Sequence, residues 1–485
     1  MNSPAARSLC AHLARGGARR SVAYETLNID QPRTLVHLEI IDFCDRRVDR
    51  QPGHGMQSLT HATGRARRFG ALLFAILFVY YGGLYWLWLA GAGFYDRWMK
   101  FIGVTAWKFP FLDIIAVLSW GDCHHAGFDV LYSNPCDPLN RPFAYSPILL
   151  DLPIHWLGVR HATAVGLVLD GAFLIMVPFL LRPDSRRALL IAILAGLSPA
   201  VVFLLERANL DIFVFTLVGA AALWATRGPA QRYLSYIVYF AAGLMKYYPL
   251  ILLGLIVRER PRIALAIGAA AGAILIAFAT YYWSIMRQEL MPETRYFGNM
   301  IGGALLPFGV AIYFGLSHRA GEIMFVALLI VMVLVAVRLA GRLKTELSAA
   351  DWNRPNFLLL VVGAALTVGC FVAGPSVGYR AAVLLFVIPG LLELQARARD
   401  RGLRLVAWGA LAAALLCLWR QFIETRLIDA GLLRIDSIGG LEFLLVREAL
   451  WWGLVSVLTA FIVVYVLHSP MWRAAMTGYA HLTAR

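Results

Sequence analysis

Long apolar runs recur along this 485-residue chain, and they constrain its fold more than any other feature. A helix needs about 20 mostly apolar residues to cross the roughly 30 Å hydrocarbon core of a bilayer. Phe69–Gly91 and Ala449–Leu467 reach this length, and 60% of all residues are hydrophobic while only 15% are charged. Membrane-spanning β-strands would instead be short and alternating. The sequence therefore predicts an all-α, polytopic membrane protein.

Basic residues cluster between the apolar runs, and these clusters predict how the chain is oriented. The net charge is +15. Clusters such as Arg65, Arg67 and Arg68 lie at the ends of spans rather than along one soluble face, which argues against a nucleic-acid partner. Because Lys and Arg are enriched in cytoplasmic loops, we place the N-terminus inside. Residues 94–160 then form a first external loop, with interfacial helices.

The alternation of the basic clusters predicts about ten transmembrane helices plus one re-entrant helical hairpin. The hairpin is Tyr233–Val257, because a single span there would put Arg258, Arg260 and Arg262 outside, and Pro249 lies near its bend. The predicted spans are Phe69–Gly91, His161–Leu181, Ala188–Glu206, Asp211–Thr226, Ile263–Trp283, Ile323–Leu339, Phe357–Ala373, Tyr379–Leu394, Leu405–Ile423 and Ala449–Leu467.

The two ends of the chain differ from its middle. Residues 1–64 are rich in Arg and have no apolar run of membrane length, so we expect a flexible, basic cytoplasmic segment, within which Met56 is an alternative start. Residues 65–470 form the membrane domain, and residues 471–485 a cytoplasmic tail.

The external loop carries the residues that suggest chemistry. Asp113 lies at the start of a short helix predicted to begin near Pro110. Either the helix dipole favours its charge there, or the carboxylate is a general base at the membrane surface, and the local pattern favours the first reading. Cys123 and Cys136 lie in an oxidising compartment and predict a disulfide. The neighbouring histidines match no standard zinc spacing, so no metal is expected.

Several charged residues are predicted to reach the same external surface as Asp113. Arg207 follows a predicted span and is placed to bind a phosphate, while Asn209 or Asp211 could cap the returning helix. Lys246 is expected to be a lone cation in an apolar stretch, with no adjacent acid, and such charges are usually functional. Tyr379 and Arg380 follow in an external turn.

Three cations and one candidate base suit the transfer of a group from a lipid phosphate donor. Loss of a polyprenyl phosphate develops negative charge on oxygen, which cations stabilise while the carboxylate deprotonates the acceptor. A monophosphate leaving group needs no metal, and the sequence has no nucleotide-binding motif. No cofactor is therefore expected.

The order of the motifs resembles the family 87 glycosyltransferases of the GT-C superfamily, over roughly residues 70–470. Members use polyprenyl-phosphate sugars, typically mannose, at the external face of a membrane, with inversion and with a catalytic Asp in the first external loop. One departure is Ala208, where the family often has Gly. The matching segments are Gly127–Tyr132, Arg141–Pro147, Glu206–Asp211, Leu244–Pro249 and Gly378–Arg380, after the Asp on a short helix.

The resemblance implies a GT-C type fold and a role for each matching residue. Asp113 becomes the general base, which reverses the reading from its local pattern. The residues implied to bind the donor phosphate are Lys246, Arg207 and Arg380. The residues implied as further substrate contacts are Tyr145, Asn209, Asp211, Tyr247 and Tyr379.

The expected activity is therefore sugar transfer, in the inner membrane of a bacterium with the active site on the periplasmic side. The partners would be a polyprenyl-phosphate sugar, a lipid or glycan acceptor and the membrane lipids. A transporter or flippase of lipid-linked sugars is the alternative, and internal repeats of hydropathy would favour it. A purely structural membrane protein would need neither Lys246 nor a carboxylate in the external loop.

Overall fold

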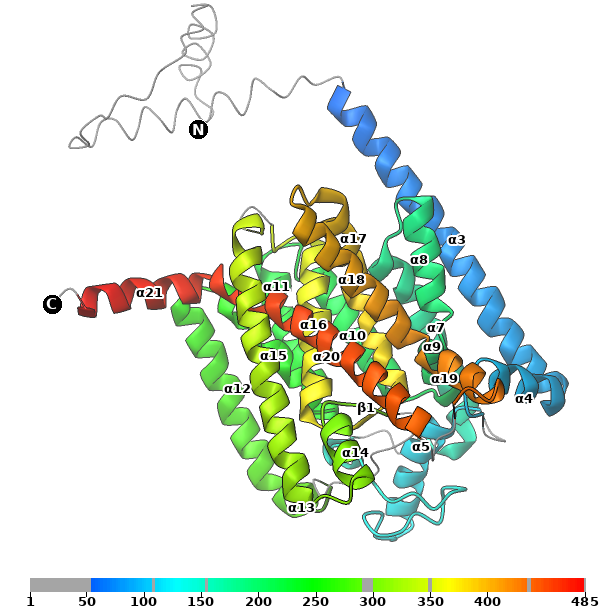
Figure 1. Cartoon of the computed structure of the whole chain (residues 1–485). Coiled ribbons are helices and arrows are strands. Elements are labelled where there is room, and N and C mark those ends of the chain that lie inside the picture. The colour runs from blue at the N-terminus through cyan, green and yellow to red at the C-terminus, as the bar shows by residue number, and fades with distance from the viewer. Residues whose placement is uncertain are drawn as a thin grey trace, which may run out of the picture. The chain divides into compact units, whose positions relative to one another are not determined.

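Helices make up nearly all the regular structure of the computed structural model, which describes residues 54–106, 110–152, 156–289, 300–347, 351–433 and 438–483 (Figure 1). Residues 1–53 of the segment expected to be flexible lie outside the described residues, and the chain is helical from His54. Residues from Arg68 onward form one compact unit.

The elements follow one another along the chain with short connections. They are α3 (His54–Ala90), α4 (Ala92–Phe101), α5 (Leu112–His125), α6 (Ile148–Asp151), the 3₁₀ helix η1 (Val159–His161), α7 (Ala162–Leu181), α8 (Arg186–Gly196), α9 (Pro199–Arg207), α10 (Leu210–Trp224), α11 (Pro229–Met245), the 3₁₀ helix η2 (Tyr248–Arg258), α12 (Pro261–Tyr281), α13 (Trp283–Glu289), β1 (Met300–Ile301), α14 (Leu305–Tyr313), α15 (His318–Glu346), α16 (Pro355–Ala373), β2 (Ser376–Val377), the 3₁₀ helix η3 (Gly378–Phe386), α17 (Val387–Arg397), α18 (Arg401–Leu418), α19 (Arg420–Asp429), α20 (Ile438–Leu467) and α21 (Pro470–Thr483).

The chain is a multi-pass membrane protein. Among the described residues, eight helices are long and apolar enough to cross a membrane, or nine if the bent pair α8 and α9 is one span. About ten spans were predicted. The missing one is α10, whose 15 residues extend about 22 Å at 1.5 Å per residue and do not cross a hydrocarbon core of about 30 Å.

The spans differ in how much of their surface other helices cover. The apolar part of α16 is 78% buried, whereas that of α12 is only 6% buried. Figure 1 shows α16 among α10, α15 and α20, and α12 at the edge of the bundle. Because both helices are similarly apolar, the exposed surface of α12 suits contact with lipid tails rather than water.

The span predicted over Ala188–Glu206 is broken into two helices. These helices, α8 and α9, meet at an angle of 49°. Pro199 is the first residue of α9, and proline has no N–H to continue the hydrogen bonds of α8. Ser198 supports the break by donating its hydroxyl to the Ala195 carbonyl over 2.7 Å. The break sets the direction of α9 and therefore the position of Arg207, its last residue.

The chain turns back on itself between α11 and η2, as the charge pattern predicted for the hairpin. Arg232, near the start of α11, binds Glu259, directly after η2, with 3.0 Å between Nη2 and Oε2. The Tyr236 hydroxyl also donates to Glu259 over 2.7 Å. At the other end a Cβ on Gly243 would lie 2.5 Å from the Leu250 side chain, so the close approach of the two arms requires glycine. Lys246 lies at this bend.

A two-residue antiparallel pair joins segments that are far apart in the sequence. Met300 of β1 lies opposite Val377 of β2, and Ile301 lies opposite Ser376. The pair fixes the start of η3, which packs against α9. It thereby brings the turn at Gly378 close to the end of α9.

Candidate active site

Asp113 lies in the first turn of α5 and is held by three residues from two other segments of the chain. Asn209 Nδ2 donates to its Oδ2 over 2.7 Å, and Arg141 Nη1 donates to its Oδ1 over 3.2 Å. Arg207 Nη1 lies 3.9 Å from the same Oδ1. The two shorter contacts fix both oxygens of the carboxylate in place.

The backbone just before Asp113 is unusual. Phe111 has φ 63°, the left-handed conformation that a bulky side chain rarely adopts. Its N–H donates to the Glu206 carbonyl over 2.7 Å. Ala208, which follows Arg207, is also left-handed with φ 44°. Phe111 and Ala208 lie in the same apolar cluster. Such conformations concentrate at functional sites.

Asn209 is the hub of the site. Its Oδ1 caps α10 by accepting from the Asp211 N–H over 2.9 Å, and it also accepts from Lys246 Nζ over 2.7 Å. Its amide nitrogen lies within hydrogen-bonding distance of Asp113, of the Tyr145 hydroxyl at 2.9 Å and of the Tyr379 hydroxyl at 2.8 Å. Asn209 therefore caps α10, as predicted, and also contacts Asp113, Lys246 and two tyrosines of the candidate site.

Lys246 is not the isolated cation that its apolar surroundings predicted. Its Nζ lies 2.9 Å from Asp211 Oδ1. Asp211 also accepts from Arg380 Nε over 3.2 Å and from the Tyr248 hydroxyl over 3.0 Å. The expectation was wrong because the acid lies 35 residues away in sequence, on α10. Tyr248, whose hydroxyl contacts Asp211, follows Tyr247, for which a substrate contact stays a prediction.

Arg141 is a member of the site that the sequence motif contained but that was given no role. Besides Asp113, it binds Asp137 with 2.8 Å between Nη2 and Oδ1, and it donates from Nη2 to the Leu112 carbonyl over 2.7 Å. Burial alone would raise the pKa of the Asp137 carboxyl, but the hydrogen bonds and charge of Arg141 outweigh burial and lower this pKa. The ion pair therefore fixes Arg141 beside Asp113.

The loop that carries Arg141 is closed by a disulfide. Cys123, at the end of α5, is bonded to Cys136, the pairing that the sequence predicted. Trp120 Nε1 donates to the Arg141 carbonyl over 3.1 Å, and its ring packs on Tyr145 with 5.1 Å between centroids. Burial, followed by the charge of Asp113, raises the pKa of the Tyr145 hydroxyl, so this hydroxyl stays protonated.

Each of the three predicted phosphate ligands lies beside an acidic side chain, and Lys246 and Arg380 share Asp211. Arg207 binds Glu206 with 3.1 Å between Nε and Oε2, and it lies near Asp113. Arg380 binds Asp211 and donates from Nη1 to the Ser376 hydroxyl over 2.8 Å. The structure thus brings together these predicted site residues: Asp113, Tyr145, Arg207, Asn209, Asp211, Lys246, Tyr379 and Arg380.

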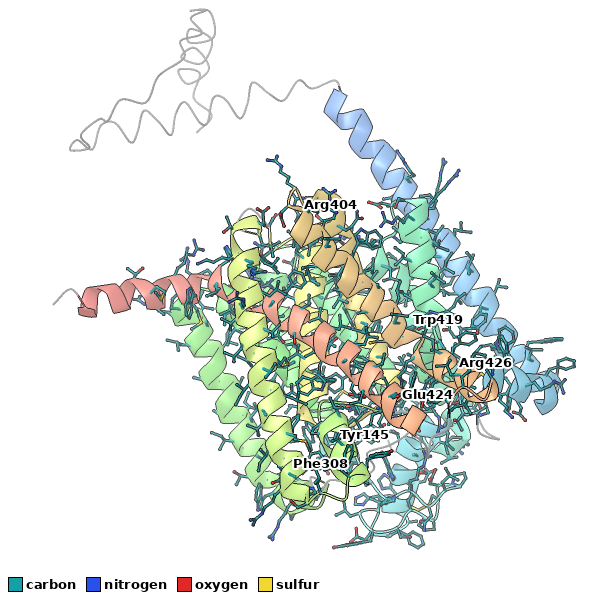
Figure 2. All side chains as sticks on the ribbon, in the orientation of Figure 1. Tyr145, Phe308, Arg404, Trp419, Glu424 and Arg426 are labelled. Atoms are coloured by element: carbon teal, nitrogen blue, oxygen red, sulfur yellow. A yellow bond between two sulfur atoms is a disulfide. The ribbon has the colours of Figure 1, made fainter. Side chains whose placement is uncertain are left out.

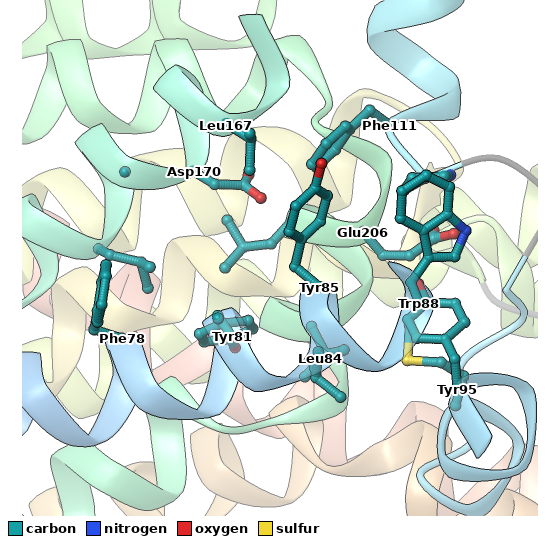
Figure 3. Close-up of a pocket in the computed structure, with 17 residues that line it drawn as sticks. Phe78, Tyr81, Leu84, Tyr85, Trp88, Tyr95, Phe111, Leu167, Asp170 and Glu206 are labelled. Carbon is teal, nitrogen blue, oxygen red and sulfur yellow. The ribbon is translucent and has the colours of Figure 1, made fainter. Parts of the chain in front are cut away.

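An apolar cavity of about 320 Å³ is lined by Pro110, Phe111 and Glu206, next to the residues described above. It is bounded by α3, α7 and α9, and Figure 3 shows Tyr85 and Phe111 facing it together with the two acids Asp170 and Glu206. Its rim includes Phe78 and Leu167, which are exposed on the outer surface of the helices.

No group of three or more His, Cys, Asp or Glu side chains within the described ranges is arranged to hold a metal ion. Comparison with models of protein families, with curated proteins and with solved structures found no match. The geometry and the chemistry of the side chains therefore carry the functional argument.

Proposed function

We propose that this protein is an inverting membrane glycosyltransferase that moves a sugar, mannose in the first instance, from a polyprenyl-phosphate donor to a lipid or glycan acceptor. Asp113 is the general base. The reaction takes place on the external, periplasmic side, at the surface from which the loop carrying Asp113 projects. The donor, the acceptor and the side of the membrane all belong to this proposal.

The observation that carries the proposal is the difference between Asp113 and the other carboxylates around it. The Asp113 side chain is 17% exposed, whereas those of Asp137, Glu206 and Asp211 are 0%, 2% and 5% exposed. All four have a basic partner, since Arg141 Nη1 lies 3.2 Å from Asp113 Oδ1, but Asp113 is the most exposed of them. Asp113 is therefore the carboxylate that an acceptor hydroxyl can reach.

A single accessible carboxylate supports a direct displacement. The acceptor hydroxyl gives its proton to Asp113 as its oxygen attacks the anomeric carbon, and the bond from that carbon to the phosphate oxygen breaks. The products are the new glycoside and the polyprenyl phosphate, and the proton then leaves Asp113. A double displacement would need a second accessible carboxylate as nucleophile. One displacement inverts the configuration at the anomeric carbon.

Cations near Asp113 support a phosphate leaving group. Arg380 is the more exposed of the proposed ligands, at 26%, and Arg207 is 12% exposed. Lys246 is buried against Asp211, so we assign it the task of neutralising that acid and holding Asn209. Arginine presents a planar fork that suits phosphate oxygens. Arg380 and Arg207 would thus contact the phosphate, with Lys246 behind them.

The apolar cavity supports a lipid-linked donor. A polyprenyl chain is long and has no polar atoms, and it needs an apolar surface that begins close to the phosphate site. The cavity begins at Pro110 and Phe111, next to Asp113, and ends among side chains exposed on the lipid-facing surface. A donor lying there would place its tail in the cavity and its phosphate near Arg207.

The test uses membranes that express the chain. They are incubated with radiolabelled polyprenyl-phosphate mannose and with a fractionated lipid and glycan extract of the native host. We expect a labelled product that is absent from membranes carrying Asp113→Asn. An equal yield from both membranes would refute the assignment of Asp113 as the base. If no fraction of the extract gave a labelled product, the proposal of a transferase would be refuted.

A further inference from the structure

A second group of buried polar side chains lies where α19 meets the start of α20, and the transfer chemistry proposed above does not use it. We call it the α19–α20 cluster: Arg420, Gln421, Glu424, Arg447 and Glu448. Four of the five are less than 10% exposed. Arg420 interacts electrostatically with Glu424, Arg447 and Glu448. Figure 2 labels Glu424 on α19.

Some polar atoms of this cluster have no hydrogen-bond partner in the part of the chain that the structure describes. They are Oε1 and Nε2 of Gln421, Oε2 of Glu424 and Oε2 of Glu448. Gln421 is 4% exposed and Glu448 is 0% exposed. Buried polar atoms are nearly always paired, and leaving one unpaired is costly. The described part of the chain supplies no partner for these four atoms, which leaves them available to a ligand.

The composition of the cluster indicates the chemistry of that ligand. Two arginines and two glutamates balance, so the ligand should carry no net charge, unlike a phosphate. Arginine only donates hydrogen bonds, an ionised glutamate only accepts them, and glutamine does both. A hydroxyl group both donates and accepts, so it can form a hydrogen bond with each of these side chains. A ligand with several hydroxyl groups meets this mixture.

Aromatic rings adjoin the same part of α20. Trp451 and Trp452 lie three and four residues after Glu448 and so share its face of the helix. Trp452 packs edge-on against Phe371 of α16, with 5.0 Å between ring centroids. An apolar wall beside polar groups is the usual composition of a site for a small organic ligand. A sugar ring offers both kinds of surface.

The cluster is joined to the candidate active site through the short β pair. Arg420 Nη1 donates to the Met300 carbonyl over 3.0 Å, and Met300 is paired with Val377. The adjacent Ser376 hydroxyl accepts from Arg380 over 2.8 Å. A glycan whose reacting hydroxyl is at Asp113 would therefore have a second polar surface for another of its sugars.

We propose that the α19–α20 cluster binds a neutral, hydroxyl-rich sugar of the acceptor, next to the sugar whose hydroxyl reacts. The identity of this sugar as part of the acceptor rests on the transferase proposed above. The sugar of the donor has the same chemistry, so the test must distinguish the two sources.

The test measures binding to the purified full-length protein in lipid nanodiscs, without turnover. The acceptor probe is octyl α-mannopyranoside, followed by tryptophan fluorescence, and the donor probe is a short-chain polyprenyl-phosphate mannose. The variants are Gln421→Met and Glu424→Met. Glu322→Gln, on the exposed surface of α15, is the control.

We expect each cluster variant to weaken octyl mannoside binding about tenfold, the effect of losing hydrogen bonds to one side chain, and to leave donor binding unchanged. Because the removed Gln421 atoms bind no described side chain or backbone group, Gln421→Met should fold at least as stably as the parent. Octyl mannoside affinity equal to that of the control would overturn the inference, as would an equal loss of affinity for the donor. A failed transfer reaction would leave this binding result unaffected.

Discussion

The buried ion pair between Lys246 and Asp211 allows the sharpest test of how the site is built. The two side chains are 6% and 5% exposed, with 2.9 Å between Nζ and Oδ1. Removing one partner leaves an uncompensated buried charge, which typically costs about 3 to 5 kcal/mol. Lys246→Met leaves Asp211 with Arg380 and Tyr248 as partners, so we expect the lower end, about 3 kcal/mol. Asp211→Asn leaves Lys246 facing an amide and should cost about as much.

The double variant separates this pairing from two independent contributions. With both charges gone, no buried charge is left unpaired at this position, and Arg380, at 26% exposure, can turn toward water. We therefore expect Lys246→Met/Asp211→Asn to cost about 3 kcal/mol rather than the 6 kcal/mol expected for independent sites. Unfolding of the purified protein in detergent, followed by tryptophan fluorescence, gives the three free energies.

A matched pair on the surface provides the control. Glu393 and Arg397 lie 3.1 Å apart, but Arg397 is 59% exposed. Exposed ion pairs contribute about 1 kcal/mol or less, so Arg397→Met should change the free energy of unfolding by no more than that. If the costs of Lys246→Met and Asp211→Asn simply add, to within about 0.5 kcal/mol, the coupling inferred from the structure is wrong.

Three further predictions concern the surroundings of Asp113. Cys136→Ser opens the disulfide and should cost roughly 3 kcal/mol of loop stability, seen as faster cleavage of the loop by trypsin under conditions in which the membrane helices stay intact. The pKa of Asp137 is lowered in the folded state, so its ion pair with Arg141 stabilises the loop above the unfolded-state pKa. This stabilisation is lost as the pH falls through the folded-state pKa. Asp137→Asn should therefore remove the acid-dependent loss of trypsin resistance. A Cβ on Gly166 would lie 2.6 Å from the Phe111 ring, so Gly166→Ala should displace Phe111 and lower the transfer rate roughly 100-fold, measured with the labelled donor.

Each of these predictions has a contrasting result. Trypsin resistance of Cys136→Ser equal to that of the oxidised parent would contradict the role of the disulfide. A pH profile unchanged by Asp137→Asn would assign the acid sensitivity elsewhere. For the third, Gly272→Ala is the control, since a Cβ there meets no atom within 4 Å; equal rates for the two alanine variants would contradict the coupling of Phe111 to Asp113.

The helices were predictable because membrane-length apolar runs are a local property of the sequence. Charge clusters even placed the turn between α11 and η2, where the bases at both ends exclude a single span. The break before Pro199 was missed although the proline was visible, because the apolar run continues through it. The helix α10 was predicted as a span because it is apolar, although its 15 residues are too few to cross the hydrocarbon core.

The polar site was predictable only in part, because its contacts are long-range. The sequence grouped Asp113, Arg207 and Arg380 by their common side of the membrane. It could not pair Lys246 with Asp211, since the two lie on different elements. Arg141 could have been found from its place in a matching motif, but its bond to Asp113 depends on how the loop folds back.

The central claim is that Asp113 removes the proton of the acceptor, and one measurement tests it most directly. The transfer rate and the donor affinity of Asp113→Asn are compared with those of Asp129→Asn, an exposed acid of the same loop. Loss of a general base should lower the rate by about 10² to 10⁴-fold, with donor affinity retained and with Asp129→Asn behaving like the parent. Transfer by Asp113→Asn at the parental rate would contradict the claim.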